Sequence, residues 1–229
     1  MPGILYAIPT PLGGAAADAL PAAALATVRT LRDFVVEDAK SARAFLKDVE
    51  MPCPMQDLRI STLDGDLLPH VRTLKAGSSV GLLSEAGCPA IADPGAKLVE
   101  AAQQAGIRVV PLIGPSSIVL ALMASGLEGQ RFAFCGYLPR EAEQRKTRIR
   151  ELEARSRRER ETQIFIETPY RNEVLLVSLL EVLSEKTSLC IATDLTLPTE
   201  QIQTQFISGW RGTVRAIGKR PTVFLLLSE

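Results

Sequence analysis

Short apolar runs alternate with amphipathic segments along this chain, and no tight-hairpin signal separates them. Strands that alternate with helices favour parallel sheets covered by helices on both faces. The pattern therefore predicts an α/β protein. The expected strands are residues 4–8, 34–36, 79–83, 107–112, 132–137, 163–167, 189–192 and 222–227.

Segments with helical periodicity fill the spaces between these runs. They are residues 20–31, 41–49, 64–75, 96–102, 118–123 and 175–183. Residues 213–217 alternate in polarity and predict an antiparallel strand. The chain has 229 residues, so we expect two domains, residues 1–115 and 116–229. Each is predicted to be an αβα domain with a mostly parallel or mixed sheet.

The stretch from Gly81 to Gly95 leads from a predicted strand into a predicted helix through a long loop of small residues. Such connections usually take about 2 to 6 residues, whereas this one takes roughly a dozen. Open α/β sheets bind ligands at the carboxyl ends of their strands, and small residues let the backbone approach a ligand closely. The loop therefore predicts a ligand site, and the Gly-Pro-Ser-Ser loop at 114–117 ends the next strand in a similar way.

Charge and motifs narrow the classes of function. The 26 basic and 26 acidic residues give zero net charge, so contact with nucleic acid would need a local patch. Residues 140–160 supply nine basic and five acidic residues, a surplus of 9 − 5 = 4, with the signs interleaved at helical spacing. This segment is either the solvated face of a helix or a contact for a polyanion. The Gly-x-Gly-x-x-Gly pattern of dinucleotide sites is absent.

The cysteines lie far apart, and the single histidine, His70, is close to none of them. A zinc site needs clustered ligands, so we expect no metal, and scattered thiols fit a reducing cytosol. No signal peptide precedes the first strand, and no run reaches the ~18 apolar residues of a membrane helix. We therefore expect a cytoplasmic protein without a membrane segment, in which Trp210 is a packing anchor.

Glu37 and Asp38 are adjacent acids at the end of a predicted strand, and Lys40 follows two residues later. One carboxylate could accept a proton while the lysine attracts an anionic substrate. The same residues could instead cap the amino terminus of the helix that follows. The local sequence leaves both interpretations open.

Several stretches, taken in order, resemble motifs of one family, the tetrapyrrole methylase superfamily. Residues 5–13 (Leu-Tyr-Ala-Ile-Pro-Thr-Pro-Leu-Gly) resemble its opening motif, and 37–40 (Glu-Asp-Ala-Lys) its Glu-Asp-Thr-Arg element. Residues 84–89 and 93–95 are similar to Ser-Asp-Ala-Gly-Thr-Pro and Asp-Pro-Gly, and 109–116 to Val-Pro-Leu-Pro-Gly-Pro-Ser. Residues 132–139 and 165–171 continue the resemblance, which covers nearly the whole chain.

The resemblance implies two α/β domains with S-adenosylmethionine in the cleft between them, in a homodimer. It further implies a methyltransferase of the branch that methylates ribose 2′-hydroxyls in ribosomal RNA of the small ribosomal subunit. The residues carried over as cofactor-binding are Pro9, Leu83, Ser84, Glu85, Ala86, Gly87, Pro89, Asp93, Ser116, Ser117, Tyr137, Leu138, Ala192, Pro221 and Thr222. The candidates for catalysis are Glu37, Asp38, Lys40 and Glu85, with a carboxylate as the base for a weakly nucleophilic hydroxyl.

The chain departs from the family motifs mainly on the substrate side. The departures are Gly14-Ala15, Ala39-Lys40, Glu85, Cys88 and Lys219-Arg220-Pro221. They keep two alternatives open. One is a methyltransferase for a small, tetrapyrrole-like molecule, which the zero net charge favours. The other is a non-catalytic scaffold or regulator that binds S-adenosylmethionine, which the altered element at 37–40 favours.

Overall fold

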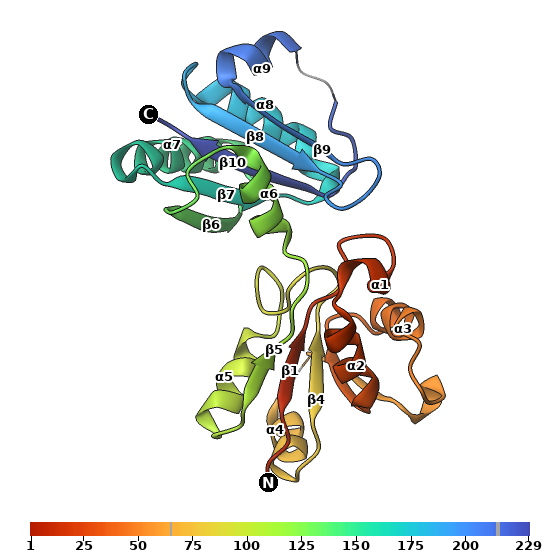
Figure 1. Cartoon of the computed structure of the whole chain (residues 1–229). Coiled ribbons are helices and arrows are strands. Elements are labelled where there is room, and N and C mark those ends of the chain that lie inside the picture. Colours follow the sequence, from red (N-terminus) through yellow and green to blue (C-terminus); the bar gives the residue numbers. More distant parts are fainter. Residues whose placement is uncertain (65, 214–215) are drawn as a thin grey trace. The chain divides into compact units, whose positions relative to one another are not determined.

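The computed structural model describes residues 1–64, 66–213 and 216–229. The chain divides into two compact units, Met1–Ser116 and Ser117–Glu229, each with its own five-stranded sheet (Figure 1). The predicted α/β class with two sheets is confirmed. Among the helices in the described ranges, none is both long and apolar enough to cross a membrane.

The sheet of the first unit is entirely parallel, with the order β3-β2-β4-β1-β5. Its strands are β1 (Leu5–Ile8), β2 (Asp33–Val36), β3 (Arg59–Thr62), β4 (Val80–Leu83) and β5 (Val109–Pro111). Four of them lie within or overlap predicted runs. The sequence did not predict β3, because this edge strand reads Arg-Ile-Ser-Thr and buries none of its residues fully.

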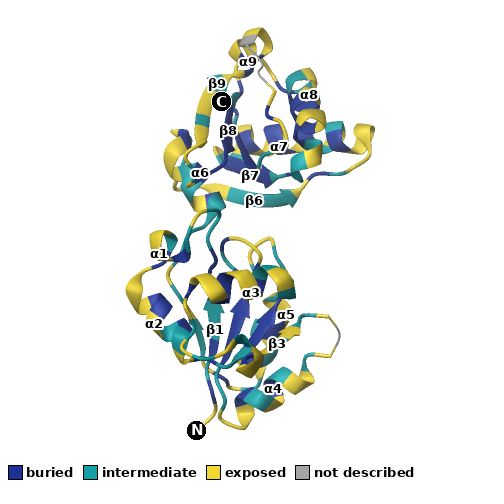
Figure 2. Ribbon diagram, turned by 90° about the vertical axis from the view of Figure 1, so that its right-hand side faces the viewer, coloured by how far each residue is buried: buried dark blue, intermediate teal, exposed yellow. Residues whose placement is uncertain are grey.

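Helices cover both faces of this sheet and bury a separate core on each. The helical elements are α1 (Ala16–Ala19), α2 (Ala22–Thr30), α3 (Ala39–Asp48), η1 (Met55–Asp57), α4 (Leu68–Lys75) and α5 (Ala96–Gln104). One core joins Ile8 and Phe34 to α2 and α3, and the other joins Leu82 to α4 and α5. Figure 2 shows buried strands between helices whose outer faces are exposed. The helix predicted from residue 64 begins at Leu68, where Asp66 accepts a hydrogen bond from the Leu68 amide (2.9 Å) and Pro69 occupies the first turn.

The strand order sets the position of a ligand site in this unit. The neighbouring strands β1 and β4 continue to helices on opposite faces, because β1 connects to β2 through α1 and α2, whereas β4 connects to β5 through α5. Open α/β sheets bind ligands outside the carboxyl ends of strands at such a switch in connection. We therefore expect a ligand to bind at the loops that follow β1 and β4.

The second unit has a mixed sheet with the order β6-β7-β10-β8-β9, in which the neighbours β6 and β7 pair in parallel and the other three pairs are antiparallel. Its strands are β6 (Phe132–Tyr137), β7 (Thr162–Ile166), β8 (Ser188–Thr193), β9 (Gln201–Phe206) and β10 (Thr222–Leu227). The predicted strand at 213–217 was wrong where it can be judged: Thr213 ends a helix, Ala216 and Ile217 belong to no strand, and residues 214–215 lie outside the described residues. An antiparallel edge strand is present at β9 instead. The sequence did not predict it, because its three glutamines interrupt any apolar run.

The helices of this unit are α6 (Ser117–Ser125), α7 (Ala142–Glu159), η2 (Pro169–Arg171), α8 (Asn172–Val182) and α9 (Ile207–Thr213). Most of the charged segment at 140–160 forms α7, which is largely solvent-facing, but two of its ionic side chains, Arg145 and Glu153, are buried. Arg145 donates to the Ser178 hydroxyl (3.0 Å) and the Arg140 carbonyl (2.8 Å), and Glu153 accepts from the Ser184 amide (2.8 Å). Trp210 is a packing anchor, as predicted: it is buried in the core.

Candidate functional site

Three loops meet at the carboxyl ends of β1, β4 and β5 and are tied together through backbone groups. Thr10 and Gly87 exchange two hydrogen bonds, with N···O distances of 2.9 and 3.0 Å. The Ser84 hydroxyl donates to the Gly87 carbonyl (2.9 Å), and the Cys88 thiol donates to the Pro115 carbonyl (3.3 Å). The first unit therefore gathers the predicted cofactor residues of these loops in one place: Pro9, Leu83 to Gly87, Pro89, Asp93 and Ser116.

Two glycines allow this close approach. A Cβ atom on Gly114 would lie 2.4 Å from the Cβ of Pro9, which is a steric clash between non-bonded carbon atoms. Gly87 has a φ of +78°, where an L side chain is strained, and its Cβ would lie 3.2 Å from Leu12 Cδ2. A larger side chain at Gly114 would separate the loops, and one at Gly87 would be strained by the backbone conformation.

The loop after β4 also holds two alanines in the left-handed region, Ala90 (φ 65°) and Ala92 (φ 66°). Non-glycine residues rarely adopt this conformation, and each costs of order 1 kcal/mol or more. Such strain persists only where surrounding contacts over-determine the backbone, and it concentrates at ligand sites. The loop is therefore shaped for more than a connection between a strand and a helix.

Three carboxylates lie close together at this edge. The Glu85 amide donates to Glu37 Oε2 (3.4 Å), and Asp93 is near enough to both acids to feel their charges. Burial and the charges of Glu37 and Glu85 raise the pKa of Asp93 to about 6. Burial likewise raises the pKa of Glu37, with smaller contributions from the charges of Glu85 and Asp38. The edge is thus short of positive charge, and a bound cation would relieve the repulsion.

The other two candidates for catalysis have different surroundings. Asp38 is the amino-terminal cap of α3: its Oδ1 accepts from the amides of Lys40 (3.0 Å) and Ser41 (2.7 Å). These bonds, the strongest from the Ser41 amide, lower the pKa of Asp38. Lys40 is exposed on the first turn of α3. Sequence analysis assigned Asp93 to the cofactor and missed its coupling to Glu37, which follows from β2 and β4 being neighbours.

An open hollow of about 490 Å³ adjoins these loops within the first unit. Glu85 and Thr10 line one side of it, and α3 lines the other through Phe45 and Asp48. Asp48 also accepts a hydrogen bond from the Ala16 amide (2.6 Å), which fixes the start of α1 beside the hollow. The remaining lining residues are small: Pro11, Gly13, Gly14, Ala15 and Ala44. Glu85 therefore faces a space in which a second reactant has room.

The predicted cofactor residues of the second unit also gather at one edge of their sheet. Tyr137 pairs with Ile166 at the end of β7, Val223 pairs with both Ile166 and Ala192, and Thr222 pairs with Thr193. Leu138 and Ala192 are buried, whereas Tyr137 is exposed. Ser117 stands apart from these residues in the sequence and begins α6. Pro221 immediately precedes β10.

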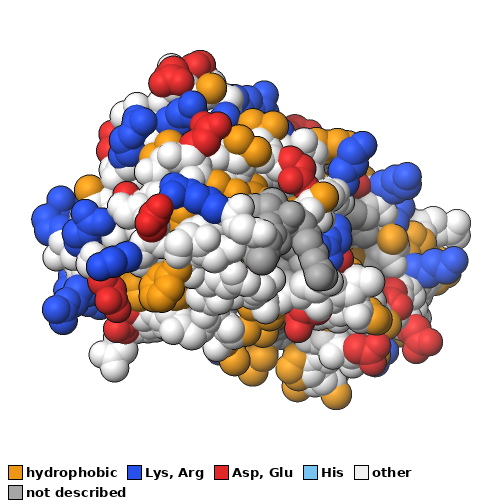
Figure 3. All heavy atoms as spheres, turned by 90° about the horizontal axis from the view of Figure 1, so that it is seen from above, with side chains coloured by type: hydrophobic (Ala, Val, Ile, Leu, Met, Phe, Trp, Pro, Cys, Tyr) orange, Lys and Arg blue, Asp and Glu red, His pale blue; other side chains and the backbone are white. Residues whose placement is uncertain are grey.

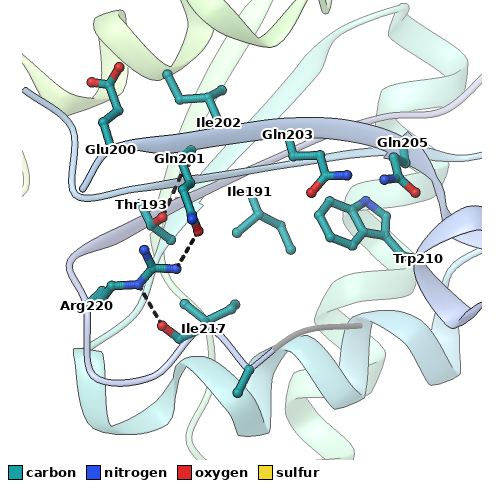
Figure 4. Close-up of a pocket in the computed structure, with 11 residues that line it drawn as sticks. Ile191, Thr193, Glu200, Gln201, Ile202, Gln203, Gln205, Trp210, Ile217 and Arg220 are labelled. Carbon is teal, nitrogen blue, oxygen red and sulfur yellow. Dashed lines mark hydrogen bonds between the residues drawn. The ribbon is translucent and has the colours of Figure 1, made fainter. Parts of the chain in front are cut away.

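A polar pocket of about 640 Å³ on the second unit was not predicted (Figure 4). Gln201, Gln203 and Gln205, which alternate along β9, line the pocket, and Trp210 lies at its right-hand end in Figure 4, beside Gln205. Arg220 lies at the opposite end and donates to Gln201 Oε1 (3.0 Å). Ile191 and Thr193 line this pocket, so Ala192 points to the opposite face of β8. The alternating glutamines were the only sequence signal for it.

The residues of the first unit fit S-adenosylmethionine. The cofactor carries a positively charged sulfonium and an ammonium group, and the three carboxylates supply complementary charge. The positive φ of Gly87 and the absence of side chains at Gly87 and Gly114 keep backbone groups close together at the strand ends. The fit rests on charge and on this backbone cradle.

Comparisons with known proteins agree with this geometry. The sequence model of one family, Tetrapyrrole (Corrin/Porphyrin) Methylases, matches residues 6–208. The chain is 35% identical over 200 residues to the ribosomal RNA small subunit methyltransferase I of Vibrio cholerae serotype O1, covering 87% of this chain and 67% of that protein. It is 33% identical over 211 residues to the protein of the same name from Bacillus subtilis (strain 168), covering 91% and 70%.

Among solved structures, that of the methyltransferase CobJ is similar with a TM-score of 0.65 at 19% identity, covering 100% of this chain and 95% of that one. At this identity the likeness shows the fold alone. The family match and the identities above 30% show the family as well as the fold. The family assignment agrees with the cluster of loops at the strand ends. The chain therefore belongs to the tetrapyrrole (corrin/porphyrin) methylase family and is an S-adenosylmethionine-dependent methyltransferase.

Proposed function

We propose that this enzyme transfers a methyl group from S-adenosylmethionine to a ribose 2′-hydroxyl of ribosomal RNA in the small ribosomal subunit. The observation that carries the proposal is the carboxylate of Glu37, which accepts a hydrogen bond from the amide of Glu85, a residue that lines an open hollow next to the predicted cofactor loops. The names of the relatives from Vibrio cholerae and Bacillus subtilis support the RNA substrate.

The chemistry needs alignment and one proton acceptor. S-adenosylmethionine supplies an already activated methyl group, so orientation of the hydroxyl behind it provides much of the acceleration. A ribose hydroxyl is a weak nucleophile, and a carboxylate that takes its proton helps the attack. Glu37 suits this role because its raised pKa makes it a better proton acceptor. Asp38 suits it less, because its carboxylate already holds two backbone amides.

The charge distribution supports recognition through local contacts. Basic and acidic side chains are interspersed on the face shown in Figure 3, without a single broad basic field. Most of the local surplus of 9 − 5 = 4 at residues 140–160 lies on α7, where Arg148, Arg155 and Arg158 are paired with glutamates. Binding of RNA by this protein should therefore depend on salt less steeply than binding through a continuous basic surface.

The direct test is transfer of radiolabelled methyl groups to purified small ribosomal subunits and to their naked RNA. Labelled RNA should then be digested with alkali, because a 2′-O-methyl group protects the adjacent phosphodiester bond. We expect label in an alkali-resistant dinucleotide. Label in tetrapyrrole-like compounds but not in RNA would support the small-molecule alternative. Calorimetric binding of the cofactor without transfer to any acceptor would support the non-catalytic alternative.

We also propose that the enzyme is a cytoplasmic homodimer. The support for a dimer is α6, which is anchored in its own unit through Ile118 and Ala121 while Val119 and Met123 on its other side are exposed. Exposed apolar side chains grouped on one helix face suit a contact between protein chains. Sedimentation equilibrium should give twice the monomer mass for the native chain and the monomer mass for Met123→Glu. A native monomer would contradict the dimer but not the methyltransferase activity.

A further inference from the structure

A tyrosine and a lysine form an exposed pair on the second unit. Tyr170 lies on η2, directly after β7, and 78% of its surface is accessible to solvent. The Lys219 ammonium lies 4.9 Å from the centre of its ring. A cation at this distance is attracted to the ring face, weakly at an exposed site, and so favours this orientation of the aromatic side chain. Only part of the ring is covered, so an aromatic surface still faces solvent.

Buried contacts hold the two segments of this pair together. The fully buried Asn172 donates through Nδ2 to the Arg220 carbonyl (2.7 Å) and to the Thr222 hydroxyl (3.1 Å). Glu173 accepts a hydrogen bond from the Gly218 amide (2.9 Å). Lys219 thus lies between two anchored neighbours, and Tyr170 precedes the helix that carries both anchors. The backbone beside both members of the pair is therefore anchored at this end of the sheet.

Two of the three acidic side chains nearby, those of Glu167 and Asp194, are buried, whereas Glu173 is exposed and accepts the hydrogen bond from the Gly218 amide. Glu167 has a side chain only 1% exposed and forms an ion pair with Arg171 (3.1 Å). Asp194, whose side chain is 8% exposed, lies 3.5 Å from Arg220. In both ion pairs the carboxylate is buried, whereas the arginine side chain keeps part of its surface in solvent. The surface therefore presents an aromatic ring, the cationic groups of Lys219, Arg171 and Arg220, and one carboxylate, that of Glu173.

The pair lies at the edge that carries the predicted cofactor residues of this unit. Tyr137, another exposed tyrosine, pairs with Ile166 immediately before the segment that leads to Tyr170. Thr222 lies at the same edge, two residues after Arg220. A substrate in contact with Tyr170 would thus be near the end of the sheet where the resemblance locates the cofactor.

We propose that Tyr170 stacks on a base of a single-stranded RNA segment, while Lys219 and Arg171 contact the adjacent phosphates. The inference rests on the proposed function and names a contact that selects its substrate. An exposed ring suits a single strand, because bases in a duplex are already stacked and RNA-binding proteins stack unpaired bases on aromatic side chains. The cationic neighbours suit the backbone that flanks such a base.

The test is fluorescence anisotropy with a labelled single-stranded RNA of about 12 nucleotides and with the same sequence as a duplex. We expect the native protein to prefer the single strand. Tyr170→Ala should weaken single-strand binding by about tenfold, because it removes a stacked base. Tyr170→Phe keeps the ring and should bind within about twofold of the native protein. Lys219→Ala should lower the slope of log affinity against log salt by about 0.7.

Lys186→Ala is the matched control, since it removes an exposed lysine at the opposite end of the sheet, before β8. It should change neither the salt slope nor the preference for single strands. Circular dichroism and calorimetric titration with S-adenosylmethionine should show that Tyr170→Ala is folded and binds the cofactor as the native protein does.

Equal RNA affinity of Tyr170→Ala and the native protein would overturn the stacking contact. If the native protein still methylated RNA in that case, the proposed function would stand without it. A native protein that bound the cofactor but neither bound nor methylated RNA would overturn both. Loss of binding in Tyr170→Phe as well as in Tyr170→Ala would show that the hydroxyl, rather than stacking, makes the contact, and would also overturn the inference.

Discussion

Thr10 and Gly87 donate backbone hydrogen bonds to each other's carbonyl groups, at 2.9 and 3.0 Å, and so join the loops that follow β1 and β4. The two residues lie 77 positions apart in the chain. Because these loops leave neighbouring strands toward opposite faces of the sheet, this pair of bonds closes the edge where the cofactor is expected. The loops therefore respond together to a change in either one.

Gly87→Ala tests this connection. The substitution places a side chain at a φ of +78° and should lower the free energy of unfolding by about 1–2 kcal/mol. Gly106→Ala is the matched control, since Gly106 has a φ of +68° but nothing within 4 Å of its added Cβ. Both variants should lose similar stability in urea titrations, and only Gly87→Ala should lose affinity for S-adenosylmethionine in calorimetry. Equal affinities in the two variants would contradict a cofactor role for this loop.

Asp93→Asn tests the carboxylate cluster through the pH dependence of stability. The pKa of Asp93 is raised from 3.8 to about 6 in the folded protein, so its contribution to stability is full below pH 3.8 and is lost as pH rises through 6. Asparagine does not titrate. We therefore expect the difference in free energy of unfolding, variant minus native protein, to increase by about 1 kcal/mol from low to neutral pH. This value includes a discount for solvent screening of the half-buried group.

Urea unfolding at about pH 4 and about pH 7.5 measures this difference. Saturating S-adenosylmethionine should reduce it, because a bound cation favours the ionised aspartate. A difference that does not change with pH would show that neither burial nor the charges of Glu37 and Glu85 raise the pKa of Asp93.

Substitutions of Asp38 separate a helix cap from a catalytic base. Asp38→Ala removes the acceptor for the amides of Lys40 and Ser41 and should lower the thermal unfolding midpoint. Asp38→Asn keeps a side-chain oxygen in place and should retain most of the stability, because asparagine is also a strong cap. Asp38→Asn should also keep methyl transfer. A folded Asp38→Asn enzyme without activity would identify Asp38 as the base instead.

Glu37→Gln tests the proposed proton acceptor. The amide cannot take the ribose proton, so kcat for methyl transfer should fall by about 10²- to 10⁴-fold while the fold is kept. In the native enzyme kcat should fall as the solution becomes acidic enough to protonate Glu37, and the raised pKa of this group shifts that fall to higher pH than for an ordinary glutamate. Single-turnover assays across pH measure both effects. Unchanged kcat in Glu37→Gln would exclude this residue as the base.

Local sequence was sufficient for most elements of the fold. Buried strands such as β4 and β10 are short, mostly apolar runs, and their length and bounding turn residues distinguish them from buried helices. The edge strands β3 and β9 carry no such signal: Ile60 and Ile202 stand among polar residues, and pairing with a neighbour defines each strand. Strand direction in the second sheet was likewise decided by pairing across the chain.

The sequence by itself determined that small residues and glycines follow the strands near Pro9, Gly87 and Gly114, because only such residues permit backbone segments to come this close. The tertiary structure alone decided that Glu37 and Asp93 interact. They are 56 residues apart, and they interact because the order of the sheet puts β2 beside β4. Charge repulsion depends on distance in space, which the spacing of residues along a chain does not specify.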